Sequence, residues 1–228
     1  MNKLNFLREK VVISVQASSG EPLYDEKCML AMMQSVVNGG AEVLRLAGER
    51  DIKNAKKLFD IPIIGITKPK KLPENWLDTV YITPSIEDVT IIANAGADVI
   101  AFDGTTRQRT KDSLEEIISS IKSLNKFAMA DIATFEDVKN VIELGADIVS
   151  TTLSGYTTET LNRPDEPDFE LLKKIVKEFK IPVILEGRIW EVSQIKKAFE
   201  LGAFAVVVGS AVTRPQLITK RFINWSKL

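Results

Sequence analysis

Eight short runs of apolar residues, rich in valine and isoleucine, recur along the chain and limit its fold more than any other feature. Within each run the apolar residues follow one another nearly without interruption, instead of alternating with polar ones. Such a strand must be covered on both faces, as in a buried parallel sheet. The runs are Val11–Gln16, Glu42–Leu46, Ile61–Thr67, Asp98–Asp103, Phe127–Asp131, Asp147–Thr152, Ile181–Glu186 and Phe204–Gly209.

Longer segments with helical spacing separate these runs, among them Leu114–Leu124, Phe135–Glu143 and Phe169–Phe179. Strands that alternate with helices form βαβ units with right-handed connections. Eight such units in 228 residues predict an α/β protein, a single (β/α)8 barrel domain over residues 1–228, because this fold takes roughly 200–250 residues. A doubly wound open sheet is the alternative. The chain has no G-x-G-x-x-G motif after the first run, which weakly disfavours it.

A repeated Gly-Ala pattern supports the count of strands. It occurs in the segments Asn38–Val43, Asn94–Val99, Glu143–Ile148 and Glu200–Ala205, where we expect glycine to end a helix in the left-handed conformation. One further apolar run, Val80–Thr83, does not fit the count. We expect it in a long loop after the third strand, with Pro84 and Ser85 leading into the next helix.

Charge and apolar patterning argue against nucleic acid and membrane partners. The chain has 30 basic and 31 acidic residues, a net charge of −1, so no global field attracts nucleic acid or an anionic membrane. No apolar stretch approaches the ~20 residues that span a bilayer, and the N-terminus lacks the features of a signal peptide. With a single cysteine, Cys28, the chain fits a reducing cytoplasm, and we predict a buried structural thiol there.

Histidine is absent from the sequence. Its absence removes Ser-His-Asp triads, histidine bases and histidine-based metal sites together. Any acid–base chemistry must therefore come from lysine, glutamate, aspartate, tyrosine or cysteine, and we predict no metal site.

Polar residues stand at the ends of the predicted strands, where a barrel of this kind builds its active site. A terminal charge on a buried strand carries a desolvation cost unless it is paired or used. Any single member of the set fits a structural role, but the whole ring points to a functional site. Its members are Gln16, Arg45, Lys68, Asp103, Asp131, Thr151, Thr152, Glu186 and Gly209.

The loops after the seventh and eighth strands predict a phosphate site. Glycine lets a backbone approach an anion closely, and N–H groups with arginine side chains can hold it. The expected phosphate contacts are Gly187, Arg188, Gly209 and Ser210, together with Arg214. Glycines that serve only tight turns are the alternative.

Lys68 and Glu186 follow the third and seventh strands, on opposite sides of the predicted barrel mouth. A desolvated lysine loses part of its basicity, and a nearby glutamate can act as the complementary acid or base. Two such groups facing one carbon suit an epimerisation. A lysine there also suits a Schiff base, so position alone does not choose between the two.

Several motifs resemble the N-acetylmannosamine-6-phosphate 2-epimerase family of bacterial sialic acid catabolism, from Val12 to about Phe222. The Thr151–Thr157 and Thr213–Pro215 strings are the most specific. The full set is Ser14–Ala17 with Glu21–Leu23, Ile64–Lys68, Ile82–Pro84, Met129–Thr134, Thr151–Thr157, Glu186–Arg188, Val208–Pro215 and Ile218–Phe222.

This resemblance implies residue roles. Lys68 and Glu186 would be the catalytic pair, and Gln16, Arg45 and Asp131 would contact the open-chain sugar. Arg214 and backbone groups at Gly187, Arg188, Gly209 and Ser210 would hold the 6-phosphate. To the substrate contacts we add Thr152, from its place at a strand end. The family interconverts N-acetylmannosamine 6-phosphate and N-acetylglucosamine 6-phosphate without a metal or nucleotide cofactor.

The sequence departs from the family pattern at a few places. Leu46 and Ala47, Pro69, Gly104 and Ser210 replace the residues that are common there. These changes bear on substrate contacts and rate more than on reaction type. A Schiff-base aldolase and a non-catalytic sugar-phosphate sensor remain alternatives, whereas a metal-dependent pentose-phosphate epimerase would need histidine ligands. The helix faces around Trp190 and Trp225 would serve as a homodimer interface or as core.

Overall fold

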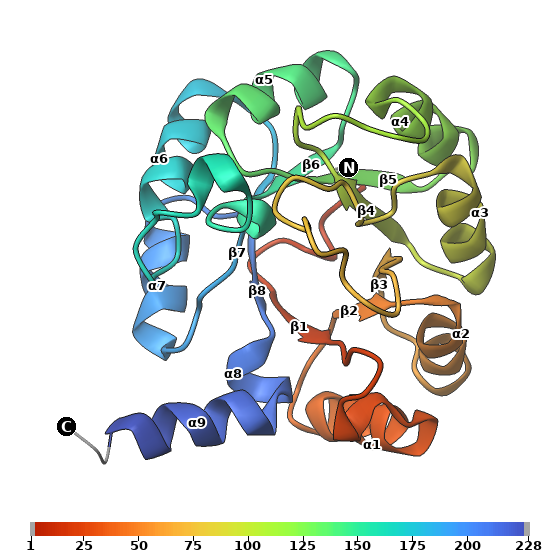
Figure 1. Cartoon of the computed structure of the whole chain (residues 1–228), viewed down its shortest axis with the longest axis vertical. Helices are drawn as coiled ribbons and strands as arrows, with labels where there is room; N and C mark the ends of the chain where they lie inside the picture. The colour runs from red at the N-terminus through yellow and green to blue at the C-terminus, as the bar shows by residue number, and fades with distance from the viewer. Residues whose placement is uncertain (1–2, 226–228) are drawn as a thin grey trace.

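The computed structural model describes residues 3–225, with side chains as far as Asn224. In this part of the chain, eight parallel strands close into a barrel in sequence order, β1 to β8, with β8 pairing back onto β1 (Figure 1). The predicted (β/α)8 architecture is confirmed. The strands are β1 (Val11–Val15), β2 (Leu44–Ala47), β3 (Ile63–Ile66), β4 (Val99–Asp103), β5 (Phe127–Asp131), β6 (Ile148–Ser150), β7 (Val183–Glu186) and β8 (Ala205–Val208).

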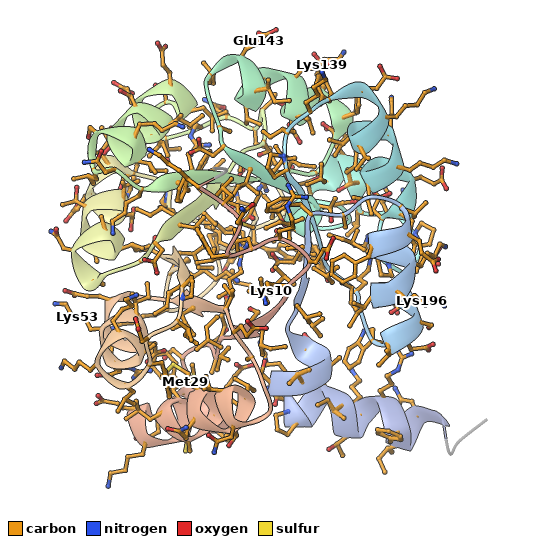
Figure 2. The ribbon with its side chains drawn as sticks, turned by 180° about the vertical axis from the view of Figure 1, so that it is seen from behind. Lys10, Met29, Lys53, Lys139, Glu143 and Lys196 are labelled. Carbon is orange, nitrogen blue, oxygen red and sulfur yellow. The ribbon has the colours of Figure 1, made fainter. Side chains whose placement is uncertain are left out.

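Helices surround the barrel between consecutive strands (Figure 1). Charged side chains such as Lys53, Lys139 and Lys196 point outward from them, as Figure 2 shows. The helices are α1 (Glu26–Asn38), α2 (Glu49–Leu58), α3 (Ile86–Ala95), α4 (Leu114–Ser123), α5 (Phe135–Glu143), α6 (Phe169–Glu178), α7 (Val192–Glu200), α8 (Ser210–Thr213) and α9 (Pro215–Trp225). Three 3-10 turns lie in the loops: η1 (Pro22–Tyr24), η2 (Thr151–Leu153) and η3 (Thr158–Thr160).

Alternate residues of each strand face two different cores. On β3, Ile64 and Ile66 belong to the cluster that fills the barrel, whereas Ile63 packs in the cluster between barrel and helices. Gly65 also faces outward, and a Cβ atom there would lie 2.4 Å from Ile92 Cγ2 of α3. Leu4 and Leu7, which precede β1, belong to the inner cluster.

The glycine pattern ends four helices as predicted. Gly40, Gly96, Gly145 and Gly202 have φ values of 98°, 104°, 93° and 93°, a region that favours glycine. The long loop after β3 is confirmed as well. Among the described residues from Thr67 to Ser85 there is no helix or strand, and Ser85 caps α3 by accepting a hydrogen bond from the Asp88 N–H.

Two predictions are corrected. The sixth strand was expected to continue to Thr152, but β6 ends at Ser150 and the next three residues form η2. The chain turns there because the Leu153 N–H bonds to the Ile132 carbonyl. Cys28 is only partly buried, since the helix turns its neighbour Met29 toward the core instead. No helix within residues 3–225 is long and apolar enough to cross a membrane.

Candidate active site

A cavity of about 810 Å³ opens at the carboxyl ends of the strands. We call it the strand-end cavity. Polar side chains from β1, the loop after β3, η2, β7 and the loop after β8 meet in its wall, where a parallel barrel places its functional loops. They include Ser14, Gln16, Lys68, Thr152, Glu186 and Arg214.

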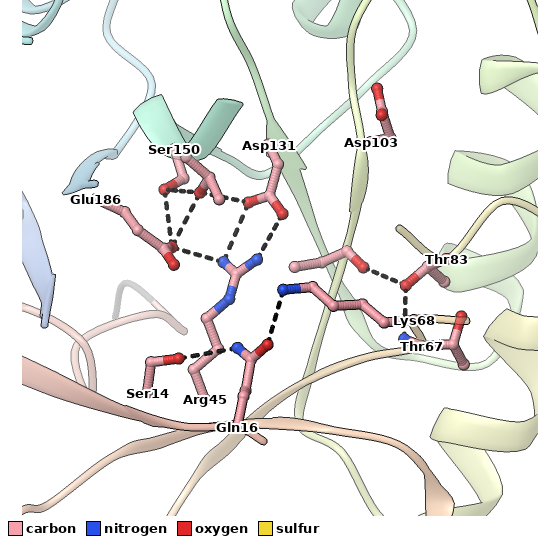
Figure 3. A network of polar contacts seen from close by, with 12 residues as sticks. Ser14, Gln16, Arg45, Thr67, Lys68, Thr83, Asp103, Asp131, Ser150 and Glu186 are labelled. Atoms are coloured by element: carbon pink, nitrogen blue, oxygen red, sulfur yellow. Dashed lines mark hydrogen bonds and ion pairs between the residues drawn. The ribbon is translucent and has the colours of Figure 1, made fainter. Parts of the chain in front are cut away.

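A buried arginine organises the polar groups at the base of this cavity (Figure 3). The two terminal nitrogens of Arg45 bind both carboxylate oxygens of Asp131, at 3.1 and 2.5 Å. Arg45 Nη1 also donates to Glu186 Oε2 at 2.8 Å. The side chains of Arg45 and Asp131 are only 1% and 0% exposed, and neither residue lines the cavity. Arg45 therefore affects the cavity only through its ion pair with Glu186, which does line it.

Glu186 belongs to the floor of the cavity and carries a perturbed carboxyl group. Burial raises the pKa of this carboxyl above its ordinary value, Arg45 opposes the rise, and the negative charge of Asp131 adds to it. The Thr152 hydroxyl lies 2.9 Å from Glu186 Oε2 and 2.8 Å from Asp131 Oδ1. A raised pKa favours the protonated form of this carboxyl, and an acid–base catalyst must be able to hold and release a proton.

Lys68 approaches the same charges from the loop after β3 (Figure 3). Its ammonium donates to Gln16 Oε1 at 2.9 Å, and Gln16 in turn donates to Ser14 Oγ at 2.8 Å. Loss of solvent around its ammonium, together with the charge of Arg45, lowers the pKa of Lys68 to about 8, although the side chain is exposed toward the cavity. Glu186 and Asp131 act in the opposite direction. Near neutral pH, a fraction of Lys68 is thus a free base.

Comparison with known proteins decides the family. Residues 29–227 match the family described as "Putative N-acetylmannosamine-6-phosphate epimerase" (NanE). The chain belongs to this epimerase family. A protein of Clostridium perfringens (strain 13 / Type A) named "Putative N-acetylmannosamine-6-phosphate 2-epimerase" is 42% identical over 223 residues, which cover 97% of this chain and 98% of the relative. A protein of the same name from Listeria monocytogenes is 42% identical over 229 residues, covering 96% and 94%.

Solved structures agree with this assignment. The N-acetylmannosamine-6-phosphate 2-epimerase from Clostridium perfringens superposes with a TM-score of 0.91 at 40% identity, covering 98% of this chain and 96% of that one. Thiamine phosphate pyrophosphorylase from Pyrococcus furiosus, at a TM-score of 0.61 and 18% identity, shares the fold alone. The resemblance found in the sequence motifs is confirmed, and those epimerase-family motifs meet at one end of the barrel.

The structure brings most of the predicted site residues together. Arg45, Asp131, Thr152 and Glu186 form one hydrogen-bonded cluster, and beside it Lys68 bonds to Gln16 (Figure 3). Thr151 is adjacent, but its hydroxyl bonds to the backbone of Glu186 rather than to its carboxylate. The roles of these residues as catalytic or substrate-binding groups stay predictions.

The predicted phosphate contacts also line the strand-end cavity, but their side chains differ in availability. Arg214 pairs with Glu21 of the loop after β1, a partner that was not predicted from the sequence. The Arg188 guanidinium donates to the carbonyls of Ser154 and Glu166, at 2.5 and 2.7 Å. Arg188 thus braces the loop after β6, and its backbone has the unusual φ of 56° beside Gly187. Phosphate contact through this side chain would require it to leave these carbonyls.

Asp103 is the ring member that does not join the network. Its buried carboxylate pairs with Arg107 at 2.5 Å and accepts hydrogen bonds from Thr105. Arg107 also donates to the carbonyls of Trp76 and Leu77, at 3.4 and 2.8 Å. Sequence reasoning missed Arg107, and the only signal for it was its position four residues after Asp103.

One departure from the family pattern has a steric counterpart. A Cβ atom on Gly104 would lie 2.7 Å from the Cβ of Ala130, so an alanine would not fit this backbone. Trp190 lines the cavity, and the Arg221 guanidinium lies 5.0 Å from the centre of its ring. The Trp225 side chain lies outside the described residues.

Proposed function

We propose that this protein is an isomerase that interconverts N-acetylmannosamine 6-phosphate and N-acetylglucosamine 6-phosphate by epimerisation at C2. The observation that carries the proposal is the placement of Lys68 and Glu186 in one cavity, with opposite shifts that bring both pKa values toward neutrality. The epimerase-family membership supports the choice of substrate.

The chemistry requires an acidic C2–H bond. Ring opening gives C1 an aldehyde, and this carbonyl makes the neighbouring C2–H acidic. In the proposed mechanism, Lys68 or Glu186 removes the C2 proton, according to direction, and the other group returns a proton to the opposite face. As negative charge develops on the C1 oxygen, a hydrogen-bond donor stabilises it. We propose Gln16 for this role because it lines the cavity and its amide has a second N–H group.

In the proposal the 6-phosphate is held at the other side of the cavity. Arg214 and backbone groups at Gly187, Arg188, Gly209 and Ser210 bind it. Such a remote grip positions C2 without taking part in the reaction, so its binding energy can be used for orientation. Arg45 lies below the floor of the cavity, where it pairs with both Asp131 and Glu186, and its charge stabilises the ionised form of Glu186.

Proton exchange in deuterated water tests the proposal. Incubated with N-acetylmannosamine 6-phosphate in D2O, the protein should remove the C2 proton signal as N-acetylglucosamine 6-phosphate appears in the NMR spectrum. No exchange and no product, from folded protein that still binds the sugar phosphate, would overturn it. Mass added by borohydride trapping would instead support a Schiff-base aldolase at Lys68.

We further propose that the enzyme acts in the cytoplasm, in sialic acid and amino-sugar catabolism, as a homodimer and without a metal or nucleotide cofactor. Light scattering of the purified protein tests the homodimer. Dialysis against a chelator tests the cofactor proposal: turnover should be unchanged, and its loss with recovery on adding a metal would overturn it.

A further inference from the structure

The hydroxyl of Thr152 stands between two carboxyl groups. Its Oγ1 lies 2.8 Å from Asp131 Oδ1, 2.9 Å from Glu186 Oε2 and 2.9 Å from Ser150 Oγ. A hydroxyl has one proton to donate and two lone pairs that accept. Thr152 can therefore donate to only one of the two carboxyl groups at a time.

Arg45 contacts the same two oxygens from another direction. Its Nη1 lies 3.1 Å from Asp131 Oδ1 and 2.8 Å from Glu186 Oε2. Because Nη1 carries two protons, it can donate to both oxygens together. Both carboxyl oxygens are thus contacted by Arg45 and by Thr152. Arg45 can donate a hydrogen bond to each of them, whereas Thr152 has a proton for only one.

The protonation state of Glu186 decides which of the two carboxyls accepts the hydrogen bond from Thr152. With both carboxyls ionised, Thr152 donates to one of them and presents a lone pair to the other. The Ser150 hydroxyl, 3.5 Å from Glu186 Oε2, compensates only weakly. With Glu186 protonated, Glu186 donates to Thr152 and Thr152 donates to Asp131, so every close contact has one proton.

We propose that Thr152 is a positioning residue whose hydroxyl reverses its hydrogen bond each time Glu186 gains or loses a proton. It donates to Glu186 when that group is ionised and to Asp131 when Glu186 is protonated. Only hydrogen bonds are exchanged, since the proton itself passes between Glu186 and substrate C2. The link to turnover rests on the proposed function, because it requires that Glu186 changes protonation state in each cycle.

The charges around Glu186 fix the direction of the expected effect. Arg45 from β2, Asp131 from β5 and Lys68 from the loop after β3 all face the carboxyl. Taken alone, the hydrogen bond from Thr152 to Glu186 lowers the pKa of Glu186. Over both carboxyls, however, a reversing hydroxyl makes one hydrogen bond when Glu186 is ionised and two when Glu186 is protonated, one of which goes to the charged Asp131. Removing the hydroxyl should therefore penalise the protonated form more.

Infrared titration of the carboxylic acid band tests the proposal without needing turnover. The band of Glu186 is assigned by its loss in Glu186→Gln. In Thr152→Val the pKa of this band should fall by about one unit, whereas loss of a hydroxyl that only donates to Glu186 would raise it; Thr152→Ser should restore the wild-type pKa. The acid limb of the pH–rate profile should move with it. Thr152→Ala replaces the valine variant if the latter does not fold.

The neighbouring threonine is a matched control. Thr151→Val removes a hydroxyl that contacts only the backbone of Glu186, so the band should titrate as in the wild type. An unchanged or raised pKa in Thr152→Val, or failure of Thr152→Ser to restore it, would overturn the inference, as would an equal shift in Thr151→Val. If the band shifts but no epimerisation occurs, the proposed function fails and the assignment of Thr152 stands.

Discussion

At the scale of single residues, two cationic side chains, Arg45 and Lys68, lie near two carboxylates, Asp131 and Glu186. Arg45 takes both oxygens of Asp131 and one of Glu186, whereas the Lys68 ammonium has Gln16 as its hydrogen-bond partner. Burial and the charge of Arg45 lower the pKa of Lys68, while the two carboxylates keep it from falling further. Because arginine stays charged at all ordinary pH values, the proton that leaves the cluster first on the basic side comes from Lys68.

The first prediction concerns the two groups that exchange this proton. Lys68→Ala and Glu186→Ala should each abolish measurable turnover, since general acid–base catalysis typically contributes ~10²–10⁴-fold and neither partner has a substitute in the network. Steady-state rates with N-acetylmannosamine 6-phosphate measure the loss, and thermal unfolding checks the fold. Near-normal turnover in either variant, with unchanged thermal stability, would show that the assignment is wrong.

The second prediction is a bell-shaped pH dependence of kcat/KM. In either direction the working pair holds one proton: below both pKa values no base is left, and above both no acid is left. The alkaline limb should therefore fall near pH 8, the pKa of Lys68, and the acid limb above 4.5, the ordinary value for glutamate. The titration of the substrate phosphate, with a second pKa of about 6, is measured separately as a control. An alkaline limb near 10.5 would contradict the lowered pKa.

At the scale of elements, loops built around the strand ends are held by residues from neighbouring units. Arg107, from the loop after β4, binds the carbonyls of Trp76 and Leu77, and so ties the long loop after β3 to Asp103 at the end of β4. The same long loop carries Lys68 and places Trp76 and Tyr81 in the wall of the strand-end cavity. Its position thus depends on a pairing that lies outside the cavity.

The third prediction tests this support. Arg107→Lys keeps a charge beside Asp103 but loses the forked geometry that reaches Leu77 as well. Loss of one or two hydrogen bonds, about 1–2 kcal/mol, should raise KM roughly 5–30-fold with a smaller effect on kcat. Trypsin should also cut faster at the exposed Lys70 and Lys71.

Arg109→Lys is the control for this variant. Arg109 donates to the carbonyls of Asp103 and Asp112 and has no hydrogen bond to the long loop among the described residues. It should leave the trypsin rate unchanged. If Arg107→Lys behaves in the same way, Arg107 does not hold the loop.

The sequence predicts features that depend on neighbouring residues, and it predicts poorly those that depend on contacts between distant residues. Strands such as Phe127–Asp131 were predicted with their observed bounds because a local apolar run defines them. The polar ring at the strand ends follows from the same runs. The partner of Asp103 and the bonds of Arg188 were not predictable, because loop conformation decides them. Thr152 was expected on a strand, but the turn that places its hydroxyl between two carboxyls depends on a contact with Ile132.

At the scale of the whole molecule, the network closes only when distant parts of the chain meet. Arg45 lies 86 residues from Asp131 and 141 from Glu186, and the three stand on β2, β5 and β7. Each strand of the closed barrel is paired on both sides, so no edge is left from which the described sheet could open strand by strand. Formation of the buried charge cluster is therefore coupled to closure of the barrel.

The last prediction follows from this coupling: we propose that the 228 residues form one domain that unfolds as one unit. Calorimetry should give a single transition with an enthalpy of roughly 160 kcal/mol near 60 °C, at about 0.7 kcal/mol per residue, equal to the van't Hoff value. Catalytic activity, which depends on Lys68 and Glu186, should be lost at the same temperature as the secondary structure. Two separated transitions, or activity lost well before the circular dichroism signal, would mean that half of the barrel unfolds independently.

We expect such a half-unfolded intermediate to be unpopulated because of the buried charges. Asp131 and Glu186 belong to the second half of the barrel and Arg45 to the first. Unfolding of the first half alone would leave the two buried carboxylates without their cation, which is strongly destabilising.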